Sequence, residues 1–212
     1  MKSLRIILVI LAVAVPLSLS AQTHELSVFL SDPHIGSSSI SFEGTPITIN
    51  ADFDEQIGYG AAYNHFFTDR VSAEFAVQRI SADTTLNVFG GGVNTSFDAG
   101  DLDLTVITGV AQWHFRTDSS YSPYVGLGVA YVSGDTESPV DVTDPTSPSE
   151  SVDLESTTSG VLNAGIDFHI TPRVAVGIDA KYFTYDAKED APDAEPLSLD
   201  TLVMSASLKL RF

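Results

Sequence analysis

The chain has 212 residues, no cysteine and a formal net charge of −18 at pH 7. The missing cysteines exclude a disulfide framework and thiolate metal ligation. So acidic a chain should avoid nucleic acid, and anionic headgroups too unless cations bridge the two. With 43% hydrophobic and 18% charged residues, the composition fits a soluble domain as well as a membrane barrel with a polar lumen.

The N-terminus has the three parts of a secretory signal. A basic start precedes the aliphatic run Ile6–Val15, and the small, turn-prone segment Pro16–Ala21 follows it. The aliphatic run is too short to span a bilayer as a helix. We therefore predict a cleaved signal peptide over residues 1–21 and one mature domain over residues 22–212. Cleavage removes two positive charges, so the mature chain is more acidic still.

Beyond the signal, apolar residues alternate with polar or small ones, which is the period of two that β-strands require. No stretch there approaches the roughly 18 consecutive apolar residues of a transmembrane helix. The alternation predicts eight strands, at Glu25–Ser31, Gln56–Phe66, Val71–Ser81, Leu102–Phe115, Tyr124–Ser133, Gly160–Ile170, Val174–Tyr185 and Thr201–Phe212.

The connections between these strands alternate in length. Three are short, at Thr68–Arg70, Arg116–Pro123 and Thr171–Arg173, and they separate four long ones, around Asp32–Glu55, Ala82–Asp101, Gly134–Ser159 and Asp186–Asp200. An all-β, antiparallel, up-and-down transmembrane barrel of eight strands has this pattern, with tight periplasmic turns and long extracellular loops. A secreted lipocalin-like barrel is the alternative, but its outer surface should be polar.

The last predicted strand separates these alternatives. One of its faces is wholly apolar, whereas the other is largely polar or charged: Leu202, Met204, Ala206, Leu208, Leu210 and Phe212 against Thr201, Ser205, Ser207, Lys209 and Arg211. An apolar exterior around a polar lumen is typical of a membrane barrel. Closure of the sheet is obligatory in lipid, because each unpaired backbone amide at a sheet edge costs on the order of several kcal/mol.

At this point the chain resembles a known family, the OmpW family of small eight-stranded bacterial outer-membrane barrels. The resemblance rests on Gln56–Phe75, Ala111–Phe115, Ser122–Tyr131, Gly165–Asp186 and the terminal Leu199–Phe212. It covers nearly the whole mature chain and departs in the loops. It implies residence in the outer membrane of a Gram-negative envelope and passage of small hydrophobic molecules. The last strand, ending in Phe212, looks like the C-terminal signal that the barrel-assembly machinery recognises.

If the N-terminus is periplasmic, each lumen-facing residue can be placed near one end of the barrel. Charged residues gather in the periplasmic half, where we predict a plug of ion pairs from Glu74, Asp167, Asp179, Lys181, Lys209 and Arg211. Apolar residues gather toward the loops, where we predict an apolar upper lumen from Ile80, Leu104, Val106, Val161, Phe183 and Val203. An eight-stranded barrel has room for its own side chains or for one small ligand.

The acidic segment Glu137–Glu155 contains no lysine or arginine. It has the composition of a solvated loop, and the alternative, a calcium site, lacks EF-hand spacing. Its carboxylates could share divalent cations with lipopolysaccharide phosphates without a dedicated site.

Catalysis would need a nucleophile beside a base and an orienting acid. His114 and His169 face the predicted lumen, and Asp167 lies two residues from His169. No serine can be placed at hydrogen-bonding distance from sequence, so a satisfied lumen network is the simpler interpretation. We predict no enzyme and no catalytic, cofactor or metal site.

Two functions remain open. The first is a narrow conduit or binding site for small hydrophobic molecules, and the second is a structural or surface-receptor barrel without transport. Neither is a general aqueous porin. The expected partners are outer-membrane lipid and lipopolysaccharide, the assembly machinery, a small hydrophobic ligand for the first function, and no nucleic acid.

Overall fold

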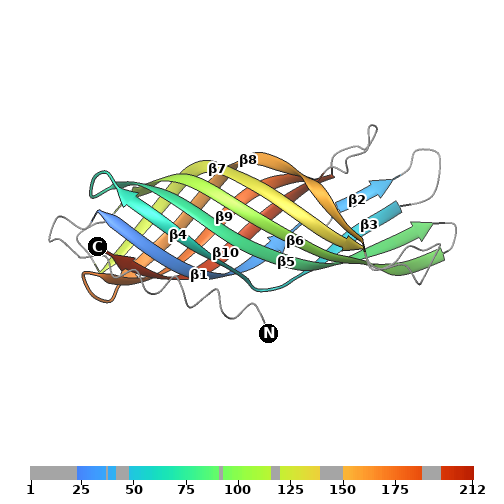
Figure 1. The fold of residues 1–212 in the computed structure, drawn as a ribbon, viewed down its shortest axis with the longest axis horizontal. Coiled ribbons are helices and arrows are strands. Elements are labelled where there is room, and N and C mark those ends of the chain that lie inside the picture. Colours follow the sequence, from blue (N-terminus) through green and yellow to red (C-terminus); the bar gives the residue numbers. More distant parts are fainter. Residues whose placement is uncertain are drawn as a thin grey trace.

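A computed structural model describes residues 23–36, 38–41, 48–90, 93–115, 120–138, 150–187 and 197–212. Eight of the strands in these ranges close into an antiparallel barrel (Figure 1), and this confirms the predicted fold. The predicted signal peptide lies outside the described residues. None of the described segments forms a helix long and apolar enough to cross a bilayer.

The barrel strands follow one another around the wall in chain order. They are β1 (His24–Ile35), β4 (Gly58–Phe66), β5 (Val71–Gly90), β6 (Val93–His114), β7 (Tyr121–Ser138), β8 (Glu150–His169), β9 (Val174–Ala187) and β10 (Leu197–Arg211). Two further strands, β2 (Ser38–Ser41) and β3 (Thr48–Glu55), form a hairpin that extends the sheet along β5. We call the end with the short turns and the C-terminus the turn end, and the opposite end the loop end.

The first and last strands close the barrel. β1 pairs with β10 from Glu25 opposite Arg211 to Ile35 opposite Thr201. At the turn end the backbone N–H of His24 donates to the Phe212 carbonyl (3.1 Å), and the N–H of Phe212 donates to the His24 carbonyl (2.8 Å). This seam leaves β1 and β10 with neighbours on both sides, as a sheet in lipid requires.

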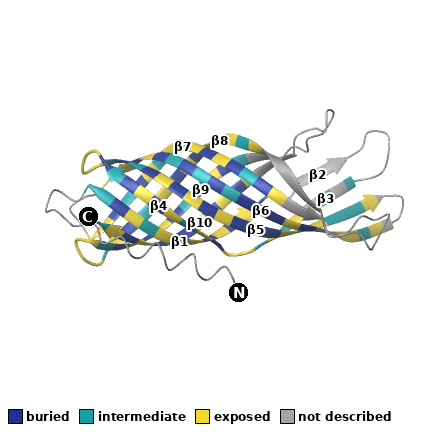
Figure 2. Cartoon of the chain, in the orientation of Figure 1, coloured by how far each residue is buried: buried dark blue, intermediate teal, exposed yellow. Residues whose placement is uncertain are grey.

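Buried and exposed residues alternate along every barrel strand (Figure 2). The exposed face carries apolar side chains, with a belt of aromatic ones near the turn end at Tyr63, Phe67, Trp113, Phe115, Tyr121 and Phe168. Tyr59, Tyr131 and Tyr182 mark a second belt toward the loop end. On β7 the belts lie about ten residues apart, which matches the 9–11 residues that a tilted strand needs to cross a bilayer.

All four predicted long loops contain strand. Asp32–Glu55 holds the end of β1 and the whole of β2 and β3, and Asp186–Asp200 holds the end of β9 and the start of β10. Ala82–Asp101 was predicted as a loop, yet β5 and β6 stay paired up to Gly90 opposite Val93. Likewise the acidic segment Glu137–Glu155 is strand at both ends, where Glu137 pairs with Ser151; residues 139–149 lie outside the described part. Above the aromatic belts neither face meets lipid, so these strands lack the alternation that predicts strands from sequence.

Substitution by arginine should reduce the stability of the barrel by different amounts on the outward and inward faces of β10. Leu208 is 54% exposed between Val28 and Val176, whereas Ser207 is buried in the lumen. Near mid-bilayer, Leu208→Arg should destabilise the folded barrel by roughly 2–4 kcal/mol. Ser207→Arg is crowded in the filled lumen, which costs about 1–3 kcal/mol, but its charge does not meet lipid, so it should cost less. Urea titration of folding into lipid vesicles measures both, and equal losses would contradict this register.

Candidate functional site

The turn-end half of the lumen contains a network of buried ion pairs. Lys181 on β9 lies 3.1 Å from Glu74 on β5 and 3.2 Å from Asp179 on its own strand. All three side chains are at most 8% exposed. A buried charge without a partner would be expensive, so the lysine and its two carboxylates have to be considered as one unit.

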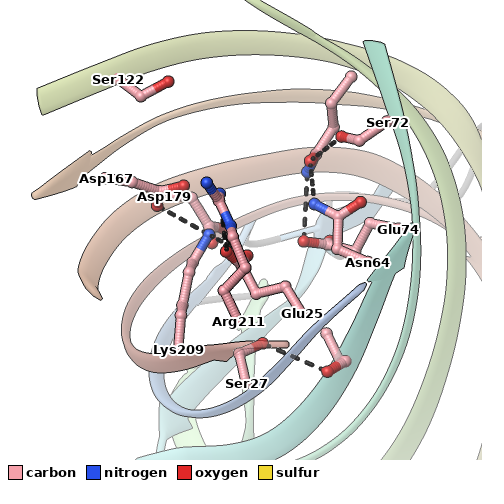
Figure 3. Close-up of polar contacts among 12 residues, drawn as sticks. Glu25, Ser27, Asn64, Ser72, Glu74, Ser122, Asp167, Asp179, Lys209 and Arg211 are labelled. Atoms are coloured by element: carbon pink, nitrogen blue, oxygen red, sulfur yellow. Dashed lines mark hydrogen bonds and ion pairs between the residues drawn. The ribbon is translucent and has the colours of Figure 1, made fainter. Parts of the chain in front are cut away.

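A second group lies beside the seam (Figure 3). Lys209 on β10 contacts Asp167 on β8 at 2.7 Å and Glu25 on β1 at 3.8 Å. Arg211 reaches the same Glu25 at 3.0 Å. The structure thus brings all six residues of the predicted plug into ion pairs. Glu25 is the member that sequence analysis missed, although it begins the predicted strand Glu25–Ser31 and shares the inward face of that strand with Phe29 and Ser31.

Gln112 on β6 connects the ion pairs to the neutral polar groups. Its side-chain oxygen accepts hydrogen bonds from the Asn64 amide (2.8 Å) and the Ser72 hydroxyl (3.2 Å). Its nitrogen donates to Glu74 (3.2 Å) and Asn163 (3.1 Å). Gln112 therefore links β4, β5 and β8 across the lumen, and no sequence motif predicts that role.

Aromatic rings and glycines complete the packing around these charges. The Lys209 ammonium lies 5.1 Å from the centre of the Tyr124 ring, and the Arg211 guanidinium lies 4.4 Å from that of Phe66. A Cβ atom at Gly177 would lie 2.6 Å from both a carboxylate oxygen of Asp167 and the hydroxyl of Ser207. The lower lumen is thus filled by side chains and leaves no room for a general aqueous pore.

The lumen histidines have no triad geometry in the described hydrogen bonds. The two ring nitrogens of His114 lie 3.1 Å from the Ser72 hydroxyl and 3.3 Å from the Ser122 hydroxyl. A triad would have an acid on one of these nitrogens. Nδ1 of His169 is buried without a hydrogen-bond partner among the described residues. The absence of enzymatic activity remains a prediction.

The loop-end half of the lumen is apolar. The six residues predicted for the upper lumen belong to one buried cluster with Ile35, Ala82, Leu102, Val110, Ala130 and Val132. We call these twelve residues the apolar cluster. Ile80, Leu104, Val106, Val161, Phe183 and Val203 are each 0–2% exposed. They therefore fill this space themselves in this conformation, and do not line an open cavity.

The wall beside the apolar cluster changes between β8 and β9. Their ladder ends toward the loops with Val161 opposite Phe183. On either side pairing continues beyond that level, to Ser138–Glu150 between β7 and β8 and to Ala187–Leu197 between β9 and β10. A bulge in the β7–β8 ladder next to Val132 accompanies the separation, and bulges bend the strand that carries them.

A closed barrel with an apolar belt outside and a filled lumen inside defines a class, the small outer-membrane β-barrels. Comparison with protein families then narrows the class. The family model described as "OmpW family" matches residues 27–212. The chain belongs to that family, and it is a protein of the outer membrane.

Solved structures share the fold at low identity. OprG from Pseudomonas aeruginosa has a TM-score of 0.62 at 16% identity, with 90% of this chain and 96% of that chain covered. Neisserial surface protein A has 0.59 at 14%, covering 89% and 97%. AlkL in DMPC lipid bilayers has 0.58 at 17%, covering 93% and 95%. At these identities the likeness shows the fold alone. A search of curated proteins found no match.

Loss of a buried ion pair should destabilise the barrel more than loss of an exposed ion pair on its surface. Lys209→Met leaves Asp167 buried without its cation and should lower the free energy of unfolding by roughly 3–5 kcal/mol. Arg79→Met breaks the exposed 3.0 Å pair with Asp103 and should cost about 0–1 kcal/mol. Fluorescence of the single tryptophan, Trp113, follows urea unfolding from vesicles. Equal costs would contradict the proposed importance of the lumen pairs.

Proposed function

We propose that this protein receives small hydrophobic molecules at the loop end and releases them sideways into the membrane. One observation carries the proposal: the apolar cluster fills the lumen beside the point where the β8–β9 ladder ends, at Val161 and Phe183. An apolar molecule replacing cluster contacts would shed water at roughly 25 cal/mol per Å² buried. The family resemblance implies the same class of cargo.

The ion-pair network explains why the proposed route does not continue along the barrel axis. A hydrophobic molecule passing Lys181 and Lys209 would separate buried charges from their partners. The cost is on the order of several kcal/mol for each pair. Polar solutes would first have to cross the apolar cluster. Both kinds of molecule therefore meet a barrier on the axial path, and only the apolar one gains from entering the upper half.

Sideways release would require two neighbouring strands to separate. This separation breaks the fewest backbone hydrogen bonds at a place where a ladder already ends. Val161 and Phe183 form the last described pair between β8 and β9, and both side chains belong to the apolar cluster. Leu162 and Tyr182, their outward-facing neighbours, are 58% and 40% exposed. A molecule displacing Phe183 would thus reach the outer edge of the apolar belt within one residue of the wall.

A barrel with a structural or surface-receptor role is the second candidate. The near-zero exposure of the apolar cluster favours it, because a ligand has to displace side chains before it can enter. The two candidates differ in whether these side chains move apart in the membrane.

The first test places a charge in the apolar cluster. Leu104→Asp should lower uptake of a hydrophobic fluorescent probe, because a carboxylate there disfavours an apolar molecule. Asn163→Asp, an isosteric change that adds a carboxylate to the already polar half opposite Lys181, is the matched control and should retain uptake. Heat-modifiable migration on gels checks that both barrels fold. If cells with wild type, either variant or no barrel take up the probe equally, the structural role stands.

The second test closes the wall. The chain has no cysteine, so Gly160→Cys with Thr184→Cys introduces one disulfide at the positions that would extend the β8–β9 ladder. Oxidation should abolish probe uptake, and a reductant should restore it. Ala180→Cys with Met204→Cys, opposite each other in the intact β9–β10 ladder, should leave uptake unchanged. Unaltered uptake through the oxidised 160–184 pair would contradict release at this place.

A further inference from the structure

A cluster of two histidines and a tyrosine lies on the outer face at the turn end, away from the lumen. His24 on β1 is directly opposite His65 on β4. Their Nδ1 atoms are 3.4 Å apart, and the Tyr63 hydroxyl lies 2.6 Å from Nδ1 of His24. The two histidines are 41 residues apart in the chain, so no motif spacing reveals the pair.

Hydrogen bonding satisfies this arrangement poorly. Nδ1 of a histidine carries either one hydrogen or one lone pair. That nitrogen of His24 nevertheless faces two groups, the Tyr63 hydroxyl and Nδ1 of His65. Nδ1 of His24 can make a good hydrogen bond with only one of these two groups. The other group is then held close to it without a strong interaction.

A transition-metal ion would use both nitrogens. Zinc binds imidazole nitrogen at about 2.0–2.1 Å, so two ligands of a tetrahedral ion lie roughly 3.3–3.4 Å apart. The measured Nδ1–Nδ1 distance is 3.4 Å. We propose that His24 and His65 form a two-histidine site for a borderline divalent metal ion, represented by Zn²⁺.

Neighbouring rings hold the two imidazoles in place. The His24 ring stacks on Phe212 with centroids 5.8 Å apart, and the His65 ring meets the edge of Phe67 at 4.8 Å. Such packing reduces the freedom that the side chains would lose on binding. No group of three or more His, Cys, Asp or Glu side chains surrounds a metal position among the described residues. Water, or Tyr63 after a small shift, would therefore complete the coordination of a bound ion.

The proposed site lies where a bound ion would affect the unfolding of the barrel. His24 is the residue whose backbone pairs with Phe212 where the seam closes. An ion shared with His65 would add a second link between β1 and β4 at the end of the ladder that already pairs them. Metal binding should therefore raise resistance to unfolding, because the ion binds the folded pair more tightly than separated histidines.

The test uses full-length protein refolded in detergent micelles without a histidine tag. Zn²⁺ titrated calorimetrically should bind at one site per barrel, and Mg²⁺, which prefers oxygen ligands, should give no comparable heat. His24→Gln and His65→Gln should each weaken Zn²⁺ binding at least about tenfold, the lower limit for losing even an outer-shell partner. His34→Gln, at the other end of β1, is the matched control. Heat-modifiable migration confirms that each variant is folded.

Two results would overturn the proposal. One is wild-type affinity for Zn²⁺ in the folded His65→Gln variant, because binding through His24 alone does not need the pair. The other is an unfolding midpoint that Zn²⁺ raises as much in the His24→Gln variant as in wild type. Tyr63→Phe assigns the third ligand: reduced affinity makes the hydroxyl a ligand, and unchanged or higher affinity makes it a competing hydrogen-bond partner.

Discussion

The constraint on which this structure depends is that every backbone N–H and C=O group within the bilayer needs a partner inside the protein. The chain meets it by pairing β1 with β10 along eleven residue positions, from Glu25–Arg211 to Ile35–Thr201. Closure then fixes the direction of each side chain, because successive residues must point alternately to lipid and to the lumen. The apolar outer face and the filled interior are two consequences of one hydrogen-bonding requirement.

A closed barrel of eight strands has too little space for both bulk water and its own side chains, so the lumen has to be packed. The turn-end half is packed with charges, of which Lys181 and Lys209 each contact two carboxylates. The loop-end half is packed with the apolar cluster. Breaking a buried ion pair is far more costly than separating apolar side chains, and the two halves therefore differ in how readily they can open.

The sequence predicted the eight strands and the division of the lumen because both follow from alternation and depth. Lys209, for example, lies between Leu208 and Leu210, and one polar residue between two lipid-facing ones has to point inward. Other features depend on which strands meet. Gln112 looks like any polar lumen residue until β6 is placed beside β5, and His24 meets His65 only through the β1–β4 register. The strands beyond the aromatic belts were missed because water, not lipid, surrounds them, and their polar residues carry no alternation.

The same constraint indicates where the wall can separate. Between the aromatic belts an unpaired strand would expose N–H and C=O groups to hydrocarbon, so the ladders are continuous there. Above the belts, water satisfies those groups, and a strand can leave its neighbour at little cost. β8 and β9 separate beyond Val161 and Phe183, where Tyr182 marks the loop-end belt. The limit of the β8–β9 ladder thus coincides with the limit of the lipid. An exit placed there joins the apolar cluster to the outer edge of the membrane without breaking the closure that keeps the barrel folded.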